Sequence, residues 1–571
     1  MSHVSNKKIA KYLFEVADLL DLKGVQFKPR AYRRAAQNIT TLSKDIKTYY
    51  ENNNLQDIEG VGESIANKVK EIIETGELEY LNDLRKEFPK GLQDMMKIEG
   101  LGPKSLIKLY KELGIESVDE LESAAKNKEI RDIEGFGEVS EQNFLENIQR
   151  YREYKERFLL GYILPIAKDI EEQLSNQDEV KRINIAGSIR RKKETIGDVD
   201  ILVVSSDSNK VMDYFTNLPH VERIVSKGST KSTIIVSENL HIDLRVIEEE
   251  SFGSALQYFT GSKSHNIKLR KIALDNNWKL SEYGLIDKEN NEKIAGEDEV
   301  EIYKKLGLDF IEPELREDRG EIKAAQEGNL PNLIELEDIK GDLHVHTKWS
   351  EGSHSIEEMA EEAKKLGYEY LAICDHAKAL QIAQGMSNDE IREQLKEIEK
   401  INKKLEDITI LSGIEANIDS EGKLDVSNDI LKDLDIVVAS VHSGFKSSEE
   451  EMTNRIINAM QNDYINIIGH PTGRLLNKRE SYDLNLTKIF EEAEEKGIFI
   501  ELNAFPERLD LTDIGCMKSR DYDLLISIDT DSHSKDHLRY MELGVATARR
   551  GWLEKKNMAN TMSLESLREI L

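Results

Sequence analysis

Three aspartates in the middle of the chain have the spacing of a site for divalent cations. Asp198 and Asp200 are separated by one residue, and Asp243 lies in a later apolar run. Side chains at i and i+2 of a strand share a face, so Asp198 and Asp200 project together, and Asp243 can join them from an adjacent strand. Three converging carboxylates repel one another unless cations are bound. Such a cluster suits two Mg²⁺ ions that serve in-line phosphoryl transfer.

A glycine-serine turn precedes these acids. The segment Gly187-Ser188-Ile189-Arg190-Arg191 offers backbone N–H groups and a hydroxyl to a triphosphate, and Arg191 adds charge. An isolated Asp-x-Asp pair is most often solvated surface. The turn, the paired arginines and the three acids in this order are much more specific.

A second group of candidate ligands lies near the C-terminus. Seven of the twelve histidines lie between positions 344 and 533: His344, His346, His354, His376, His442, His470 and His533. We expect His344 and His346 to share a strand face, Asp531 and His533 to share another, and Glu415 to end a third strand. A single histidine is more often a packed core residue or a surface residue than a metal ligand. This many histidines at one pole of a fold favour metal binding. Imidazole and carboxylate without thiolate suit Zn²⁺, Mn²⁺ or Fe²⁺, and this many ligands could hold up to three ions.

An internal repeat marks the first part of the chain. The copies Ile58-Glu59-Gly60-Val61-Gly62, Ile98-Glu99-Gly100-Leu101-Gly102 and Ile133-Glu134-Gly135-Phe136-Gly137 each precede a helix-like run. A helix, a tight Gly-x-Gly turn and a second helix present backbone N–H groups that can hold a phosphate oxygen without reading sequence. An ordinary helical hairpin also needs glycine for positive φ. Three copies in one register favour binding of the DNA backbone.

These residues must be positioned by segments whose apolar residues follow different patterns. Apolar residues recur at helical spacing from 6 to about 148. Short β-rich runs at 183–186, 199–204, 233–236 and 242–246 predict a small sheet. A polar stretch between 316 and 336 reads as a linker. Seven later runs alternate with amphipathic stretches and predict parallel βα units in a closed barrel; they lie at 342–345, 370–374, 409–414, 436–441, 465–468, 498–502 and 524–528.

Length and composition bound the possibilities. A chain of 571 residues exceeds the roughly 250 to 300 residues at which a single core stops growing. The net charge is −30, yet the first fifty residues are basic, so nucleic acid stays a candidate partner. Cys374 and Cys516 are the only cysteines, which fits a reducing cytoplasm. No apolar run is long enough to cross a membrane.

The ordered motifs from about 5 to 317 resemble the family X DNA polymerases, of which DNA polymerase beta is the best-known relative. Tyr258-Phe259-Thr260-Gly261-Ser262, with Asn266 and Arg270, resembles their nucleotide-binding helix, and 305–316 resembles the end of their thumb. Two departures are visible: His241 stands where the vertebrate relative has Arg, and Lys263 where it has Asp.

The resemblance implies roles for individual residues. Asp198, Asp200 and Asp243 would bind the catalytic metals, with Asp243 assisting deprotonation of the primer 3′-hydroxyl. Gly187, Ser188 and Arg191 would contact the incoming triphosphate. Tyr258, Phe259 and Gly261 would pack against its sugar and exclude ribose, Asn266 would touch the base, and Arg270 the template side. Lys28, Tyr32 and Lys68 fall on positions of a lyase-like domain that bind a 5′-phosphate or form a Schiff base. Lys68 is a nucleophile only if its pKa is lowered, and is otherwise an exposed phosphate-binding lysine.

The C-terminal motifs, over roughly 339 to 571, resemble the PHP (polymerase and histidinol phosphatase) family. That resemblance implies nine metal ligands: His344, His346, Glu351, His376, Glu415, His442, His470, Asp531 and His533. Glu351 departs from the usual Asp, and its longer arm would shift the metal it binds. Arg508 would bind the scissile phosphate.

We therefore expect a multidomain protein with a helical, helix-hairpin-helix N-terminal part, an α+β nucleotidyltransferase palm with a thumb, and a distorted (β/α)7 barrel. The expected boundaries are 1–85 for a helical DNA-binding, lyase-like domain, 86–150 for helix-hairpin-helix fingers, 151–252 for the palm, 253–317 for the thumb, 318–337 for a linker and 338–571 for the PHP domain.

The expected function is a DNA polymerase that fills short gaps in base excision repair and also acts as a 3′–5′ exonuclease or 3′ phosphoesterase. The palm would use two Mg²⁺ ions, and the barrel up to three Mn²⁺ or Zn²⁺ ions. The partners would be gapped or primed double-stranded DNA and deoxynucleoside triphosphates, with no membrane, and the chain would act as a monomer. Three alternatives remain: a phosphatase of small metabolites joined to another nucleotidyltransferase, a DNA-binding scaffold without catalysis, and a barrel that is only structural.

Overall fold

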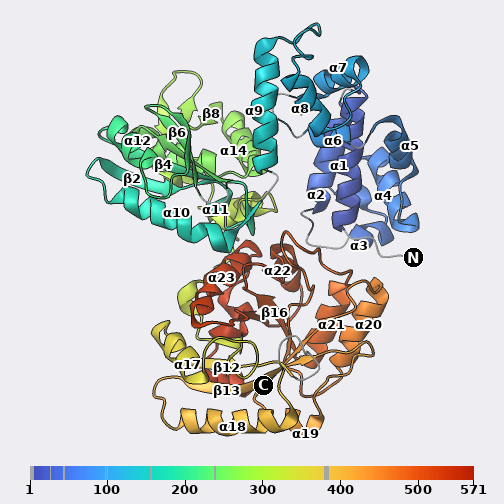
Figure 1. Cartoon of the computed structure of the whole chain (residues 1–571), viewed down its shortest axis with the longest axis vertical. Helices are drawn as coiled ribbons and strands as arrows, with labels where there is room; N and C mark the ends of the chain where they lie inside the picture. Colours follow the sequence, from blue (N-terminus) through green and yellow to red (C-terminus); the bar gives the residue numbers. More distant parts are fainter. Residues whose placement is uncertain are drawn as a thin grey trace. The chain divides into compact units, whose positions relative to one another are not determined.

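The chain folds into two compact units, Met1–Arg157 and Phe158–Leu571. The computed structural model describes residues 6–25, 27–40, 42, 46–58, 60–89, 91–96, 98, 101–154, 157–236, 239–377 and 385–571. The described residues of the first unit form helices and no strand, and the second unit holds the palm, the thumb and the barrel (Figure 1). The expected palm, thumb and barrel all lie within the second unit.

Helices of the first unit pack around a shared apolar core. They are α1 (Asn6–Leu22), α2 (Lys28–Thr40), α3 (Ile46–Glu51), α4 (Glu63–Thr75), α5 (Glu79–Glu87), α6 (Gly91–Met95), α7 (Pro103–Leu113), α8 (Val118–Lys126) and α9 (Glu138–Tyr154). The three glycine turns immediately precede α4, α7 and α9, where the repeat predicts them.

The palm is a five-stranded sheet in the order β2-β4-β7-β6-β5. Its strands are β2 (Val180–Ile185), β4 (Asp198–Ser205), β5 (Arg223–Lys227), β6 (Lys231–Val236) and β7 (Leu240–Val246). The central pair β4–β7 is parallel, while the outer pairs are antiparallel. Helices α10 (Leu160–Ser175) and α12 (Ser208–Thr216) pack on the sheet with an apolar core.

The thumb follows the palm. It contains α13 (Phe252–Thr260), α14 (Lys263–Asp275), α15 (Glu299–Lys305) and a small antiparallel sheet of β8 (Trp278–Ser281), β9 (Gly284–Asp287) and β10 (Lys293–Ala295).

The segment expected to be a linker is instead packed. It contains helix α16 (Glu321–Glu327), whose first residue, Glu321, is fully buried. Its Oε1 lies 2.7 Å from Nδ1 of the equally buried His265 in α14. Because this pair fixes the helix against the thumb, residues 318–337 do not form an extended spacer.

Seven parallel strands of the barrel follow one another in sequence order. They are β11 (Gly341–Val345), β12 (Tyr370–Ile373), β13 (Thr409–Asn417), β14 (Ile436–Ser440), β15 (Ile467–Ile468), β16 (Phe499–Asn503) and β17 (Ile526–Asp529). A bridge between Val345 and Ser532 brings the first strand to the segment after the last one, so the barrel is nearly closed. The expected (β/α)7 architecture is confirmed.

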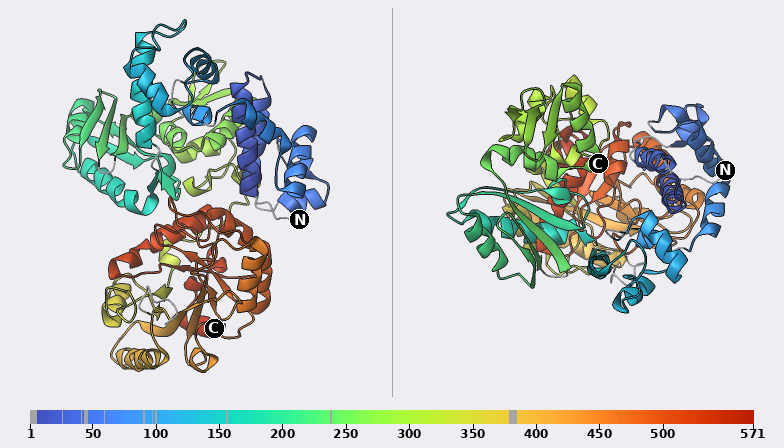
Figure 2. Two further views of the ribbon diagram at one scale, coloured as in Figure 1. Left: turned by 45° about the vertical axis from the view of Figure 1, so that its right-hand side comes forward. Right: turned by 90° about the horizontal axis from the view of Figure 1, so that it is seen from above.

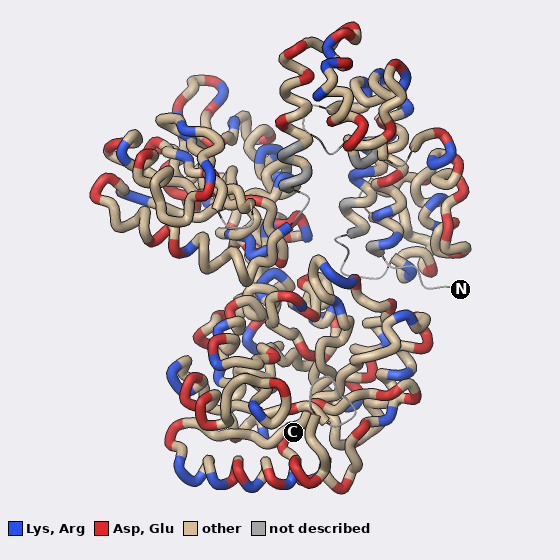
Figure 3. Tube along the Cα trace, viewed as in Figure 1, with Lys and Arg blue, Asp and Glu red and all other residues tan. Residues whose placement is uncertain are grey.

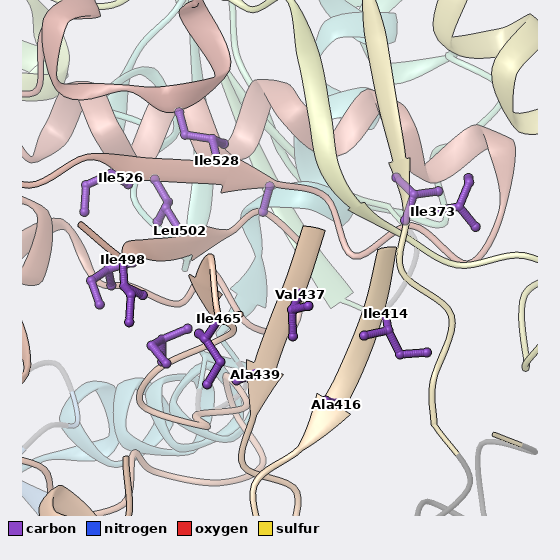
Figure 4. Packing of buried hydrophobic residues seen from close by; sticks show 14 of the residues in the cluster. Ile373, Ile414, Ala416, Val437, Ala439, Ile465, Ile498, Leu502, Ile526 and Ile528 are labelled. Atoms are coloured by element: carbon purple, nitrogen blue, oxygen red, sulfur yellow. The ribbon is translucent and has the colours of Figure 1, made fainter. Parts of the chain in front are cut away.

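Alternating strand residues face two different cores in the barrel. Tyr370, Ala372 and Cys374 belong to the interior cluster. Leu371 and Ile373 belong to the layer between the strands and the outer helices, part of which Figure 4 shows. Helices including α17 (Ile356–Lys365), α18 (Asn388–Asn402), α20 (Glu449–Ala459) and α21 (Leu486–Lys496) surround the strands (Figure 2). Because both faces of the strands pack in apolar cores, polar side chains can gather at the carboxyl ends of the strands.

Charged residues of both signs are intermixed along both units (Figure 3). The net charge of −30 therefore says little about binding, which depends on local clusters. Among the described residues, no helix is both long enough and apolar enough to traverse a bilayer.

Candidate active sites

The register of the palm sheet brings the three aspartates together. In the parallel β4–β7 pair, Asp200 lies opposite Asp243 and Asp198 lies opposite His241. Burial, together with the negative charges of Asp198 and Asp243, raises the pKa of Asp200 to about 7. A carboxylate cluster in which one acid resists ionisation is well suited to binding cations.

Asp243 is held by residues that the sequence did not single out. Thr233 Oγ1 on β6 donates a 2.6 Å hydrogen bond to Asp243 Oδ1, and Lys231 Nζ lies 2.7 Å from Oδ2. Arg245 lies 3.5 Å from the same oxygen and 3.9 Å from Asp200 Oδ1. Thr233 is directly opposite Asp243 in the β6–β7 register. His241, where the family relative has Arg, is buried beside this site.

The glycine-serine turn lies against the acids. Gly187 has a φ of 68° and begins the short helix α11 (Gly187–Arg190). A Cβ atom there would come within 3.2 Å of Asp200 Oδ2, so the close approach requires glycine. Ser188 follows in a half-buried position. The structure thus places the expected phosphate-binding turn directly beside Asp200, one of the predicted metal ligands.

Arg191 contacts protein groups from the thumb. Its Nε donates a 3.0 Å hydrogen bond to Glu317 Oε1, and its Nη1 donates to the carbonyl of Thr260. Gly261 adopts a φ of 68°, and a Cβ atom there would lie 3.2 Å from Arg191 Nη1. Gly261 therefore makes room for the Arg191 guanidinium in addition to any role beside the sugar.

The other predicted nucleotide-binding residues lie along α13 and α14. Tyr258 and Phe259 pack edge to face with ring centroids 5.2 Å apart. Asn266 is buried, donates to the Tyr258 carbonyl at 2.8 Å and accepts from Gln257 at 2.6 Å. Arg270 lies one helical turn beyond Asn266 and is half-buried.

A buried ion cluster ties the turn to the thumb. Arg190 donates to Glu299 at 2.7 and 3.1 Å and to Thr260 Oγ1 at 2.6 Å. Burial alone would raise the pKa of Glu299, but Arg316 and Arg190 lower it to about 2. Sequence reasoning missed this cluster because Arg190 lies 70 positions from Thr260 and 109 positions from Glu299 in the chain.

Every predicted barrel ligand lies at the carboxyl end of the strands. Eight of the nine form three groups whose ligand atoms lie within 4.8 Å of one another. The groups are His346, Glu351, His376 and His533; His344, His346 and Asp531; and His376, Glu415 and His442. The ninth, His470, has Nε2 at 3.1 Å from Glu415 Oε1. Asp531 and His533 were expected to share a strand face, but they lie in the segment after β17, where Asp531 has a φ of 50°.

The barrel residues fit a metal site. Within the described part of the chain, His346 Nδ1, His470 Nδ1 and Glu351 Oε2 are buried without a hydrogen-bond partner. Glu351 Oε1 lies 2.9 Å from His376 Nε2 and 3.1 Å from His533 Nε2, so its longer arm still reaches the group. Clustered imidazoles and carboxylates with unpaired buried atoms are typical of a site built for cations.

Two buried acids support the ligands. Glu501 on β16 has Oε1 at 2.6 Å from His344 Nδ1, and its Oε2 accepts from the backbone N–H of His470. Asp375 accepts hydrogen bonds from the backbone and hydroxyl of Thr347 and from Ser350 and Gln394. Glu501 orients an imidazole ligand, and Asp375 fixes the loop that leads to Glu351. Glu501 and Asn503 are two residues apart on β16, so their side chains share a face of the strand. This spacing could have identified Glu501 from the sequence.

Arg508 lies beside the ligands. It follows β16, and its Nε lies 3.6 Å from Asp531 Oδ2. Asp531 Oδ2 also accepts from Asn503 Nδ2 at 3.1 Å. A guanidinium at the rim of a cation-binding pole is well placed to contact a phosphate.

In the first unit, the described residues of the three glycine turns make the same backbone hydrogen bonds. Val61, Leu101 and Phe136 each donate a backbone hydrogen bond to the isoleucine three residues earlier. Gly60 and Gly135 have φ values of 85° and 86°. Gly62, Gly102 and Gly137 each accept from the following helix, so they begin it. Gly100 lies outside the described residues.

Lys68 on α4 lies between two tyrosines. Its Nζ is 5.9 Å from the centroid of the Tyr32 ring and 4.9 Å from that of Tyr80, and it donates weakly to Ser64. Tyr32 is buried, whereas Lys28 is exposed at the first residue of α2. The structure thus brings Lys68 and Tyr32 together.

The fold and the two sites define a nucleotidyltransferase of the DNA polymerase beta class joined to a PHP-type metal barrel. Family models match in the same order: a helix-hairpin-helix domain at 4–78, a SAM-like helix-hairpin-helix tandem at 92–150, the DNA polymerase beta palm at 163–267, the DNA polymerase beta thumb at 255–317 and the PHP domain at 342–505.

A relative that is similar over nearly the whole length of the chain identifies one family within this class. The chain is 38% identical to the DNA polymerase/3′-5′ exonuclease PolX of Bacillus subtilis, over 99% of both chains. Over the barrel region it is 34% identical to a "Probable phosphatase" of Thermoanaerobacter sp., covering 34% of this chain and 78% of that protein. It is also 38% identical to one of Caldanaerobacter subterraneus, covering 28% and 61%. The chain belongs to the PolX family of DNA polymerases.

Proposed function

We propose that this chain fills short gaps in DNA during base excision repair and trims DNA 3′ ends at its barrel. The observation that carries the polymerase proposal is the β4–β7 register, which sets Asp200 opposite Asp243 beside the Gly187 turn. The PolX relative is named for both activities. The shared geometry of the glycine turns supports DNA-backbone binding as the way in which the substrate is held.

In the palm, Asp198, Asp200 and Asp243 would hold two Mg²⁺ ions. When bound, these ions would neutralise the triphosphate and favour ionisation of the primer 3′-hydroxyl. Gly187 and Ser188 would bind the triphosphate through N–H and hydroxyl groups, and Arg191 through its charge. Thr233 and Lys231 would fix the orientation of Asp243, the acid that would assist deprotonation of the primer 3′-hydroxyl.

In the barrel, the nine clustered ligands would hold up to three Mn²⁺ or Zn²⁺ ions, which would supply Lewis-acid activation for hydrolysis of a phosphodiester. Arg508 would bind the scissile phosphate. The relatives named as phosphatases favour a second candidate for this site, removal of a 3′-phosphate. Comparison of DNA ending in a 3′-hydroxyl with DNA ending in a 3′-phosphate separates the two.

Both sites are complete within one chain, so we propose that it acts as a monomer. Its two cysteines are buried free thiols, which fits the reducing cytoplasm. In the first unit, we propose that Lys28, Tyr32 and Lys68 bind the 5′-phosphate at a gap; Schiff-base chemistry at Lys68 is tested by borohydride trapping on DNA with a 5′-deoxyribose phosphate.

Two substitutions test the two-site proposal. Asp198→Asn should abolish primer extension on gapped DNA and leave Mn²⁺-dependent 3′ hydrolysis intact, because it removes a palm ligand only. His344→Ala should do the reverse. The measurements are extension with all four deoxynucleoside triphosphates and degradation of a labelled primer without them. If either variant lost both activities while remaining folded, two independent sites would be ruled out.

A further inference from the structure

A buried arginine of the barrel contacts the nucleotide-binding part of the palm. Arg550 ends helix α23 (Met541–Arg550), and its side chain is 3% exposed. It donates to Asp513 Oδ2 at 2.7 Å and to Glu317 Oε1 at 3.1 Å. It also donates to the backbone carbonyl of Arg191 at 2.7 Å. Arg550 thus joins the barrel to the end of the thumb and to the palm.

Arg550 and Arg191 share one carboxylate oxygen. Glu317 Oε1 accepts from Arg191 Nε at 3.0 Å and from Arg550 Nη1 at 3.1 Å. Arg191 is therefore held by Arg550 in two ways, through its own carbonyl and through the acid that its side chain contacts. The carbonyl contact fixes the residue that directly follows α11, the helix of the glycine-serine turn.

Cationic side chains outnumber carboxylates at this junction between the barrel, the thumb and the palm. Arg191, Lys193, Arg319 and Arg550 surround two carboxylates, those of Glu317 and Asp513. Burial would raise the pKa of Glu317, but Arg550 and then Arg191 lower it to about 2, so the acid stays ionised. Because Arg550 supplies part of the neutralisation, Glu317 cancels only part of the positive charge of Arg191.

We propose that Arg550 is a positioning residue of the barrel for binding of the nucleoside triphosphate in the palm. This rests on the proposed role of Arg191 in contacting the triphosphate. Without Arg550, Glu317 would pair with Arg191 alone, so the guanidinium would be drawn toward the acid and its attraction for an anion would weaken. The freed Arg191 carbonyl would also loosen the turn that precedes the catalytic acids.

The test replaces Arg550 in the full-length enzyme. Arg550→Met should raise the KM for the deoxynucleoside triphosphate about tenfold, with kcat for gap filling close to that of the wild type. Mn²⁺-dependent 3′ hydrolysis should be unchanged, because Arg550 contacts none of the predicted barrel ligands. Asp513 keeps Arg319 at 3.0 Å in this variant, so it is not left as an unpaired buried charge. An unchanged KM would overturn the proposal.

Two further variants separate positioning from a structural role. Lys168→Met breaks another palm–barrel ion pair, that of Lys168 with Glu542 at 2.7 Å, and should leave the KM unchanged. Adding Glu317→Gln to Arg550→Met should bring the KM back toward the wild-type value, because Arg191 then faces a neutral partner. If KM, kcat and hydrolysis all deteriorated together and the double variant gave no recovery, Arg550 would only hold the fold together.

Arg191→Gln distinguishes the role of Arg191 in binding the triphosphate from the role of Arg550 in positioning Arg191. An increased KM in this variant with a normal KM in Arg550→Met would reject positioning by Arg550 and keep the role of Arg191. A normal KM in Arg191→Gln would reject the role of Arg191 itself, and with it the positioning proposal.

Discussion

Replacing Glu501 by Gln should weaken metal binding in the barrel while leaving the palm unaffected. The Glu501 carboxylate lies 2.6 Å from Nδ1 of the ligand His344, and both groups are fully buried. A hydrogen bond to a charged group contributes about 1.5 to 3 kcal/mol, and an amide keeps the shape but not the charge. Loss of an acid that orients a metal-bound imidazole typically lowers metal affinity or activity about 10- to 100-fold.

The assay is a Mn²⁺ titration of 3′ hydrolysis on single-stranded DNA, accompanied by metal analysis of the dialysed protein. Glu501→Gln should require about 10- to 100-fold more Mn²⁺ for half-maximal rate, whereas gap filling should match the wild type. Asp435→Asn is the matched control: Asp435 accepts from Ser412 at 2.8 Å and directly precedes β14, at the opposite end of the barrel from the ligands. An unchanged Mn²⁺ requirement in Glu501→Gln would refute the assigned orientation of His344.

Two further predictions concern the palm. Thr233→Val removes the 2.6 Å hydrogen bond to Asp243 and should lower kcat/KM for gap filling about tenfold, with unchanged 3′ hydrolysis; a wild-type rate would show that Thr233 is not needed to orient the acid. The folded-state pKa of Asp200 is raised from 3.8 to about 7, so without metal the folded state binds this proton more tightly than the unfolded state, and stability falls as pH rises between these two values. Asp200→Asn should therefore raise the Tm more at pH 8 than at pH 5 in metal-free buffer, and added Mg²⁺ should reduce the difference; equal shifts at both pH values would contradict the raised pKa.

The barrel strands could be predicted from the sequence because each is a short, buried apolar run between amphipathic stretches. Parallel topology then brings their carboxyl ends to one pole, so the positions of His344, Glu415 and His470 followed from the order of strands alone. The edge strand β5 was missed because all five of its residues are exposed and no apolar alternation marks it. Helix α16 was missed because its most deeply buried residue, Glu321, is charged and is stabilised by His265, 56 positions away.

Contacts between distant charges explain why sequence reasoning described Arg191 incompletely. The Gly-Ser turn and the Arg pair point to a phosphate, and the structure does place Gly187, at the start of that turn, against Asp200. The immediate partners of Arg191 are nevertheless Glu317, 126 positions away, and Arg550, 359 positions away. Buried ion pairs have no periodicity along the chain, since any acid can meet any base once the fold brings them together. A residue whose motif predicts ligand binding can therefore also be a junction between domains, and in this chain that junction would make nucleotide affinity depend on the barrel.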